Sequence, residues 1–283
     1  MADGLNGKVA LITGAARGQG RSHALRLARD GADIIAIDIC GEVENAGYPM
    51  ATREELAETE RLVAELGRRI STHVADVRDR TALQEAVATG IAALGRIDIV
   101  VANAGISPVG EQHPPVTWLG TVAVNLGGTI NTLEATLPHL QAGGAIVCVS
   151  SMAAFMPGFE SKEAGFGAHS KKAVARLVHD LARSLAPRDI RVNAVHPGNI
   201  DTPMVHNDGL YRLFRPDVEN PTFDDVEGVF ATLHNMPVAL LPPEQISEAV
   251  AYLVSDGARY VTGQQLKVEA GALLKSLPSG VPD

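Results

Sequence analysis

Three glycines stand close together near the start of the chain, at Gly14, Gly18 and Gly20, with the spacing G-x-x-x-G-x-G. The apolar run Val9–Thr13 precedes them and a helical pattern follows them, so they occupy a turn between a strand and a helix. Glycine lets the backbone turn there and approach a ligand closely, while the free N–H groups of the helix N-terminus favour a phosphate. The pattern predicts a site for the pyrophosphate of a dinucleotide, although an ordinary strand–helix turn can also carry glycines.

Asp38 narrows this prediction, because it stands at the end of the second apolar run. A carboxylate at that point can accept hydrogen bonds from the ribose hydroxyls of an adenosine. The same carboxylate repels a 2′-phosphate, which favours NAD over NADP. Arg17 in the glycine turn argues the other way, since a basic side chain could pair with that phosphate. We give Asp38 the greater weight and expect Arg17 to be a solvated charge.

The elements that must position these residues alternate along the chain. Seven apolar runs predict strands at Val9–Thr13, Asp33–Ile37, Ser71–Ala75, Ile97–Ala102, Ala145–Val149, Arg191–His196 and Gln265–Val268. Helical patterns lie between them, at Gly20–Asp30, Arg53–Leu66, Arg80–Leu94, Thr117–Leu140, Ser170–Ala186 and Pro243–Ser255. This alternation predicts an α/β fold: a Rossmann-type, doubly wound, seven-stranded parallel sheet in three α/β/α layers. We expect one domain over residues 1–283, with the polar segment Met204–Pro237 as a lid inserted over the substrate.

Composition excludes several classes of protein. The formal net charge of −9 disfavours binding to nucleic acid or to an anionic membrane. No apolar run approaches the roughly 18 residues of a membrane helix. The two cysteines, Cys40 and Cys148, and the histidines lack metal-ligand spacing, so we expect reduced thiols, no metal site and a cytoplasmic location.

Beyond the glycine turn, further motifs lie after successive strands. They are Asp76-Val77, Asn103-Ala104-Gly105, Asn125 in Val-Asn-Leu, Ser150-Ser151, Lys171 in a helix, and Pro197-Gly198. With these motifs the chain resembles the short-chain dehydrogenase/reductase family from Lys8 to about Leu274. The insertion Ile39–Thr52, together with Tyr211–Asp217 and Ala258–Gly263, looks like the mycofactocin-associated, carveol dehydrogenase-like branch. That resemblance implies a tightly held NAD, covered by the insertion and reoxidised by an external electron acceptor.

The resemblance also implies where the cofactor lies. Asp76 and Val77 would lie against the adenine, and Asn103–Gly105 beneath the ribose. The residues beside the nicotinamide would be Pro197, Gly198, Ile200 and Thr202. The implied cofactor contacts are Gly14, Arg17, Gly18, Gln19, Gly20, Asp38, Ile39, Asp76, Val77, Asn103, Ala104, Gly105, Lys171, Pro197, Gly198, Ile200 and Thr202.

The same resemblance implies a set of catalytic residues. In the family a tyrosine accepts the proton of the substrate hydroxyl, and a lysine four residues later lowers the pKa of that tyrosine and holds the ribose. A serine binds the substrate oxygen, and an asparagine supports a proton relay. Here Ser151, Asn125 and Lys171 match the serine, the asparagine and the lysine. The position of the tyrosine is occupied by Gly167, which has no side chain to carry a proton.

Gly167 leaves three hypotheses open. The first is a catalytically silent or impaired NAD-binding protein. The second is an enzyme that moves the proton with another group, either Ser151 with Lys171 or His113. His169 lies two positions from Gly167 and should face away around the helix. The third is that Gly167 is an altered position in an otherwise ordinary enzyme.

We expect an NAD-dependent oxidoreductase that interconverts a secondary alcohol and a ketone, with an alicyclic or terpenoid substrate as one option. The alternative is a silent NAD-binding protein that acts as a sensor or an assembly subunit. The lid would supply apolar side chains to the pocket, at Val205, Leu210, Leu213, Phe214, Phe223, Val229 and Phe230. The resemblance implies a homotetramer or a homodimer, paired through the helices predicted at Thr117–Leu140 and Ser170–Ala186.

Overall fold

The computed structural model of the protein describes residues 4–44, 46–108, 115–156 and 167–274. Its strands are β1 (Val9–Thr13), β2 (Asp33–Asp38), β3 (Ile70–Val74), β4 (Ile97–Ala102), β5 (Leu140–Val149), β6 (Arg191–Pro197) and β7 (Gln265–Val268). Its α-helices within these residues are α1 (Gly18–Arg29), α2 (Arg53–Glu65), α3 (Arg80–Leu94), α4 (Pro115–Val122), α5 (Gly128–Thr136), α6 (Gly167–Leu185), α7 (Asp208–Phe214), α8 (Phe223–Leu233) and α9 (Pro243–Val254).

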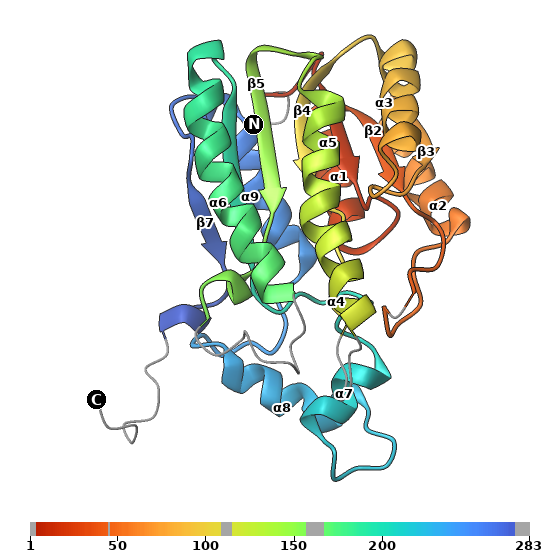
Figure 1. The fold of residues 1–283 in the computed structure, drawn as a ribbon, viewed down its shortest axis with the longest axis vertical. Coiled ribbons are helices and arrows are strands. Elements are labelled where there is room, and N and C mark those ends of the chain that lie inside the picture. The colour runs from red at the N-terminus through yellow and green to blue at the C-terminus, as the bar shows by residue number, and fades with distance from the viewer. Residues whose placement is uncertain (1–3, 45, 109–114, 157–166, 275–283) are drawn as a thin grey trace.

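All seven strands form one parallel sheet in the order β3-β2-β1-β4-β5-β6-β7 (Figure 1). The chain runs outward from β1 to β3, returns to pair β4 with β1, and then runs outward in the other direction. The loops after β1 and β4 therefore lie side by side at this switch point, where doubly wound sheets bind ligands. The predicted α/β fold is confirmed.

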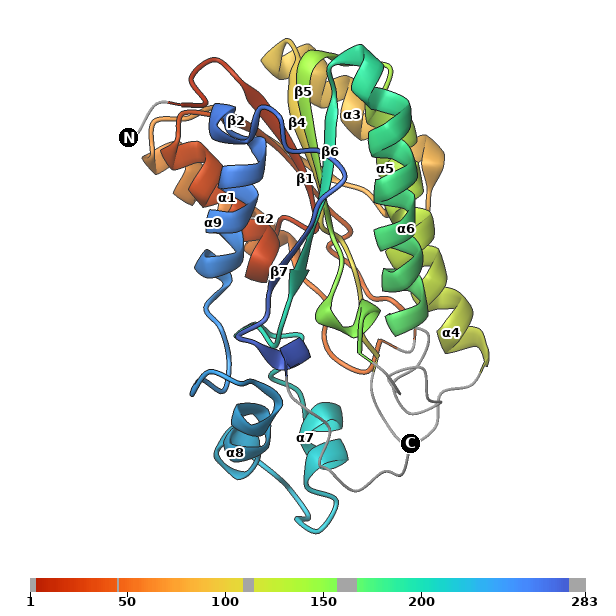
Figure 2. The same cartoon turned by 90° about the vertical axis from the view of Figure 1, so that its left-hand side faces the viewer.

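Helices cover both faces of the sheet, with α1, α2 and α9 on one side and α3, α5 and α6 on the other (Figure 2). Side chains of β1 alternate between the two layers, because successive residues of a strand point to opposite faces. Ala10 and Ile12 belong to the core with α1 and α9, whereas Val9 and Leu11 belong to the core with α3 and α6. Burial on both faces explains why the strands read as continuous apolar runs.

The helix predicted over Thr117–Leu140 is interrupted and shorter than expected. A π-helical turn at Ala123–Gly127 joins α4 to α5, and α5 ends at Thr136. Strand β5 begins at Leu140, five residues before its predicted start, since Ile97 of β4 pairs with Leu140 ahead of a register shift. Two glycines precede the apolar run of β5, so the first half of this strand could not be recognised from the sequence.

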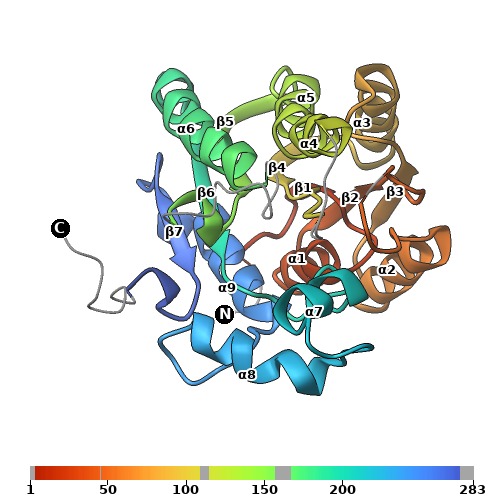
Figure 3. The same cartoon turned by 60° about the horizontal axis from the view of Figure 1, so that its bottom comes forward.

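The segment predicted as a polar lid contains two helices, α7 and α8, that the sequence analysis did not identify. Tyr211, Val226 and Phe230 form a small buried cluster between them. Both helices lie beyond the C-terminal ends of the strands, on the side of the sheet that α1 and α9 cover (Figure 3). None of the helices among the described residues is long and apolar enough to cross a membrane.

Candidate functional site

A cavity of about 530 Å³ lies at the C-terminal edge of the sheet and reaches from the glycine turn after β1 to α7 and α8. The structure brings every predicted cofactor and catalytic position to the wall of this cavity, including Gly167. Most of these positions lie at or after the C-terminal ends of β1 to β6, which the parallel topology gathers at one edge, whereas Asn125, Gly167 and Lys171 come from helical segments.

The conformation of the glycine turn depends on two glycines with positive φ and on a third glycine that packs closely against the backbone. Gly14 and Gly18 have positive φ values, +68° and +54°, which side chains disfavour. A Cβ atom built on Gly20 would lie 1.9 Å from the carbonyl oxygen of Gly14, so only glycine fits there. Asn103, after β4, braces the turn by donating its side-chain amide to the carbonyl of Thr13 at 2.9 Å.

The N-terminus of α1 opens directly onto this turn. Arg17 is its N-cap residue and makes no capping hydrogen bond with its side chain, so the first N–H groups of the helix are available to a ligand. The side-chain oxygen of Gln19 is buried and has no hydrogen-bond partner among the described residues. The open N–H groups of this helix N-terminus fit the pyrophosphate of a dinucleotide, whereas the Gln19 oxygen is an acceptor and would need a donor from another part of the ligand.

Asp38, at the end of β2, lies beside the same glycine turn. Its carboxylate accepts hydrogen bonds from the backbone N–H groups of Ala16 at 2.9 Å and Cys40 at 3.2 Å. Burial raises the pKa of the Asp38 carboxyl above its ordinary value, and the two N–H donors oppose that shift. The expectation of a solvated Arg17 is wrong: its guanidinium donates to the carbonyl of Pro49 and lies 3.6 Å from Glu55. Arg17 is engaged by the insertion rather than directed at a 2′-phosphate.

The insertion Ile39–Thr52 forms the end wall of the cavity. Val43, Tyr48 and Met50 line it, and Val43 packs in an apolar cluster with Val77 of the opposite wall. The hydroxyl of Tyr48 accepts a hydrogen bond from the N–H of Ser107 at 3.2 Å. This bond ties the insertion to the loop after β4 and encloses the half of the cavity next to Asp38.

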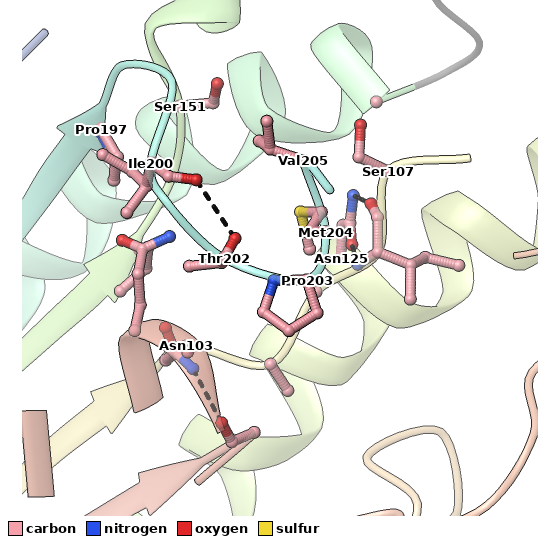
Figure 4. A pocket seen from close by; sticks show the side chains of 18 of the residues that line it. Asn103, Ser107, Asn125, Ser151, Pro197, Ile200, Thr202, Pro203, Met204 and Val205 are labelled. Carbon is pink, nitrogen blue, oxygen red and sulfur yellow. Dashed lines mark hydrogen bonds between the residues drawn. The ribbon is translucent and has the colours of Figure 1, made fainter. Parts of the chain in front are cut away.

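Asn125 lies within the π-helical turn between α4 and α5 and is buried. Its oxygen accepts from the N–H of Ile106 at 2.8 Å, and its amide donates to the carbonyl of Ile106 at 3.0 Å and to the hydroxyl of Ser170 at 3.1 Å. Asn125 therefore fastens the loop after β4 to helix α6. Figure 4 shows it across the cavity from Ser151.

Ser151 and Lys171 come from the loop after β5 and from α6. The hydroxyl of Ser151 accepts from the N–H of Ala153 at 3.1 Å, which fixes the loop. The ammonium of Lys171 donates to the carbonyl of Val149 at 2.8 Å. Burial lowers the pKa of Lys171 from 10.5 to about 8. The site thus combines a fixed hydroxyl with a cation whose proton is weakly held.

Gly167 is the first residue of α6 and also lines the cavity. Its carbonyl accepts a hydrogen bond from the hydroxyl of Ser170 at 2.7 Å. His169 is exposed on the same helix and does not line the cavity, as the helical spacing predicts. His113, the other candidate histidine, lies outside the described residues.

The end of the cavity beneath α7 and α8 is mainly apolar. Of the seven predicted apolar residues, Val205, Leu210, Leu213, Phe214 and Phe230 line it. Phe223 and Val229 do not line the cavity; Phe223 instead packs against Phe230, at a ring-centroid distance of 6.2 Å. Tyr48, Asn199, Pro203 and Met204 also line the cavity, although none of them was a predicted site residue; Figure 4 shows Pro203 and Met204 beside Thr202. Signals for them were present in the sequence. Tyr48 lies in the insertion Ile39–Thr52 and Met204 in the expected lid, while Asn199 and Pro203 adjoin predicted cofactor positions.

Comparisons with known proteins add an independent line of evidence. A family model described as enoyl-(acyl carrier protein) reductase matches residues 14–272. The chain is 42% identical to (-)-trans-carveol dehydrogenase of Rhodococcus erythropolis, over 96% of this chain and 99% of that protein. Among solved structures, it is similar to carveol dehydrogenase from Mycobacterium avium in complex with NAD, with a TM-score of 0.93, 48% identity and coverage of 96% and 100%. A short chain dehydrogenase from Mycobacterium paratuberculosis bound to NAD matches with a TM-score of 0.86, 38% identity and coverage of 96% and 99%.

Proposed function

Since the chain belongs to the short-chain dehydrogenase/reductase family, we propose that it is an NAD-dependent oxidoreductase that interconverts a secondary alcohol and a ketone. One observation carries this proposal: a single cavity joins the glycine turn to an apolar end, with Ser151 and Lys171 on its wall. A dinucleotide and a small apolar substrate can therefore meet at these polar groups.

NAD is the cofactor that the described residues fit. The open N–H groups at the start of α1 would hold the pyrophosphate. Asp38 would accept from the adenosine ribose, and its charge would disfavour the 2′-phosphate of NADP. When bound, NAD supplies the acceptor or donor of a hydride. The similar proteins solved with NAD support this choice.

The chain's own residues would then orient the reacting groups. The Ser151 hydroxyl would bind the substrate oxygen, and Lys171 would hold the ribose and favour loss of a proton nearby by its charge. Asn125 would keep the two walls together through Ile106 and Ser170. The segment Met204–Pro237 would act as the lid, because its apolar side chains close the cavity.

An alicyclic or terpenoid alcohol is the substrate class that we propose. The apolar residues beneath α7 and α8 present no charged side chain to the substrate end of the cavity. Aliphatic and aromatic walls of this kind bind a hydrocarbon ring by burial of its surface. The similarity to (-)-trans-carveol dehydrogenase supports the same class.

A second candidate function follows from Gly167, which we place at the position of the family's catalytic tyrosine. A positioned proton carrier is worth about 10²- to 10⁴-fold in rate. Without one, the protein would bind NAD but turn over slowly or not at all. A silent NAD-binding protein would serve as a sensor or as a subunit of an assembly.

Turnover separates the two candidates. The purified protein is assayed for bound NAD after desalting, and then with a panel of alicyclic alcohols, NAD and an external electron acceptor that reoxidises NADH. Gly167→Tyr is assayed in parallel. Turnover by the unchanged protein at the rate of Gly167→Tyr would exclude the silent function, whereas turnover by Gly167→Tyr alone would support it. Absence of NAD binding in both proteins would overturn both candidates.

The assembly forms part of the same proposal. Leu119 on α4 and Ile130 on α5 expose large apolar side chains to solvent, as expected of helices that pair between subunits. We expect a homotetramer or a homodimer, which light scattering after size-exclusion chromatography measures directly. A monomer at micromolar concentration would contradict this expectation.

A further inference from the structure

Six glycines among the described residues line the cavity, and Gly167 differs from the other five. A Cβ atom built on any of those five would lie within 3.3 Å of a neighbouring atom, at Gly14, Gly18, Gly20, Gly105 and Gly198. A Cβ atom built on Gly167 meets no heavy atom of the described residues within 4 Å. Neither the described packing nor the backbone conformation requires glycine at this position, so Gly167 leaves space between the described parts of the cavity wall.

Polar groups stand around this space. Lys171 lies one helical turn after Gly167, so both residues face the cavity from the same side of α6. The bond from Lys171 to Val149 uses one of the three donors of its ammonium group. Ser151 lines the same cavity from the loop after β5 (Figure 4).

Apolar groups form the remaining described surroundings. Met152, Ala153 and Ala168 line the cavity next to Ser151 and Gly167 in the chain. The start of α6 is fixed, because Ser170 donates to the carbonyl of Gly167 and receives a hydrogen bond from Asn125. The helix is therefore held against moving inward to fill the space.

We propose that this space, which we call the Gly167 subsite (the cavity wall formed by Gly167, Ala168 and Lys171 of α6), binds a phenolic hydroxyl group carried by a small molecule. This inference rests on the proposed function. It assigns to the ligand the proton-carrying hydroxyl that the chain lacks at Gly167. The planar ring contacts the apolar wall, and the hydroxyl faces Lys171 and Ser151.

The chemistry of the site selects a phenol. A phenol has a pKa near 10, and a neighbouring ammonium lowers that pKa by favouring the phenolate. A phenolate oxygen takes the proton that a substrate alcohol loses and becomes a phenol, while the hydride of the same oxidation goes to NAD. A carboxylic acid, with a pKa near 4, would hold the proton too weakly for this exchange near neutral pH.

Two sources can supply the hydroxyl. A substrate can carry a phenol ring next to its secondary alcohol, or a separate phenol can bind beside a non-phenolic substrate. The phenol hydroxyl carries the proton in both cases, and activity measurements with and without added phenol distinguish the two sources.

Binding is tested first, with 4-methylphenol as the probe and isothermal titration calorimetry as the measurement. Gly167→Phe fills the subsite with a ring that has no hydroxyl. Gly4→Phe is the control, because a Cβ atom on Gly4 also meets none of the described residues within 4 Å and Gly4 lies before β1 without lining the cavity. We expect 4-methylphenol to bind the unchanged protein and Gly4→Phe equally, and Gly167→Phe at least tenfold more weakly. Equal binding to Gly167→Phe, or no binding to the unchanged protein, would overturn the proposal.

Activity then identifies the source. With a non-phenolic alcohol, saturable activation by 4-methylphenol, tenfold or more and absent in Gly167→Phe, indicates a separate phenol. Turnover of a phenol-bearing alcohol without added 4-methylphenol, lost in Gly167→Phe, indicates the substrate. Binding at the subsite with no turnover of any alcohol would refute the dehydrogenase function and leave the subsite standing. Turnover with no binding of phenol would refute the subsite and leave the dehydrogenase function standing.

Discussion

The imidazole Nδ1 of His196 lies 3.1 Å from the main-chain oxygen of Ser151, while Nε2 lies 2.7 Å from Oε1 of Gln265. The orientation of Gln265 is set by its Nε2, which donates to the carbonyl of Ala175 at 3.1 Å. Both nitrogens of His196 therefore face acceptors. A neutral imidazole can donate to only one of them, and the imidazolium can donate to both. Burial lowers the pKa of His196, which opposes the imidazolium.

His196 positions the loop that carries Ser151 without lining the cavity itself. We expect His196→Ala to lower kcat roughly 10- to 100-fold, since a small displacement of a reacting group is costly in rate. The affinity for NAD should change less than twofold, as measured by fluorescence titration. His73→Ala, at the β3 edge of the sheet, is the control and should leave kcat unchanged. An unaltered kcat in His196→Ala would exclude the positioning role.

Asp38 should determine the choice of cofactor. Asp38→Asn removes the charge but keeps an oxygen that can accept from Ala16. Loss of a charged hydrogen bond costs about 1.5–3 kcal/mol, so we expect NAD to bind roughly 10- to 100-fold more weakly and NADP to compete better. Asp33→Asn is the matched control, because Asp33 pairs with Arg68 and Arg69 at the other end of β2. A ratio of NAD to NADP affinity that stays constant in Asp38→Asn would contradict the assignment.

Phe230 supports the proposed lid. Its side chain is 1% exposed, and its ring packs edge-to-face against Phe214 at a centroid distance of 5.1 Å. We expect Phe230→Ala to loosen α7 and α8 by about 3–5 kcal/mol and to raise KM more than it lowers kcat. Hydrogen exchange should accelerate in these two helices and not in the sheet. Leu253→Ala, in the core beside α9, should instead lower the global unfolding free energy. Uniformly faster exchange in Phe230→Ala would show that the two helices are not a separate unit.

His23 should make the fold sensitive to acid. It is fully buried between α1 and α9, where it contacts the hydroxyl of Ser247, and burial lowers its pKa from 6.5 to about 3. Below pH 6.5 the unfolded chain takes up a proton that the folded protein refuses, so stability falls as the pH falls. Relative to His23→Gln, the unfolding free energy should drop by about 1.4 kcal/mol per pH unit below 6.5. Denaturant titrations between pH 4 and pH 7 measure this slope. His179→Gln, on the exposed face of α6, should keep the wild-type slope; a parallel slope in His23→Gln would refute the prediction.

The sheet could be predicted from sequence because each strand is buried on both faces and reads as an apolar run. The strand order follows from the alternation of strands and helices, and it gathers the loops with the glycines, Asn103 and Ser151 at one edge. The bond from Tyr48 to Ser107 could not be predicted, since it joins two irregular segments 59 residues apart. Helix α7 was missed because it has only seven residues. Helix α8 could have been predicted, since Phe223, Val226 and Phe230 recur at helical spacing after the N-cap residue Thr222.

The π-helical turn at Ala123–Gly127 has a consequence for insertions and deletions in this chain. A π turn holds one residue more than the α-helical ladder would accommodate, so removing one residue there offers a route back to α geometry. Such a deletion would keep α4 and α5 near their present relative orientation, because the π turn absorbs the extra residue locally, and would change the geometry of the turn alone. Asn125 lies within this π turn, where the α-helical hydrogen-bond pattern is interrupted. The direction of its amide is therefore set by the number of residues in the turn, and a change of length would misdirect it even if every side chain were kept.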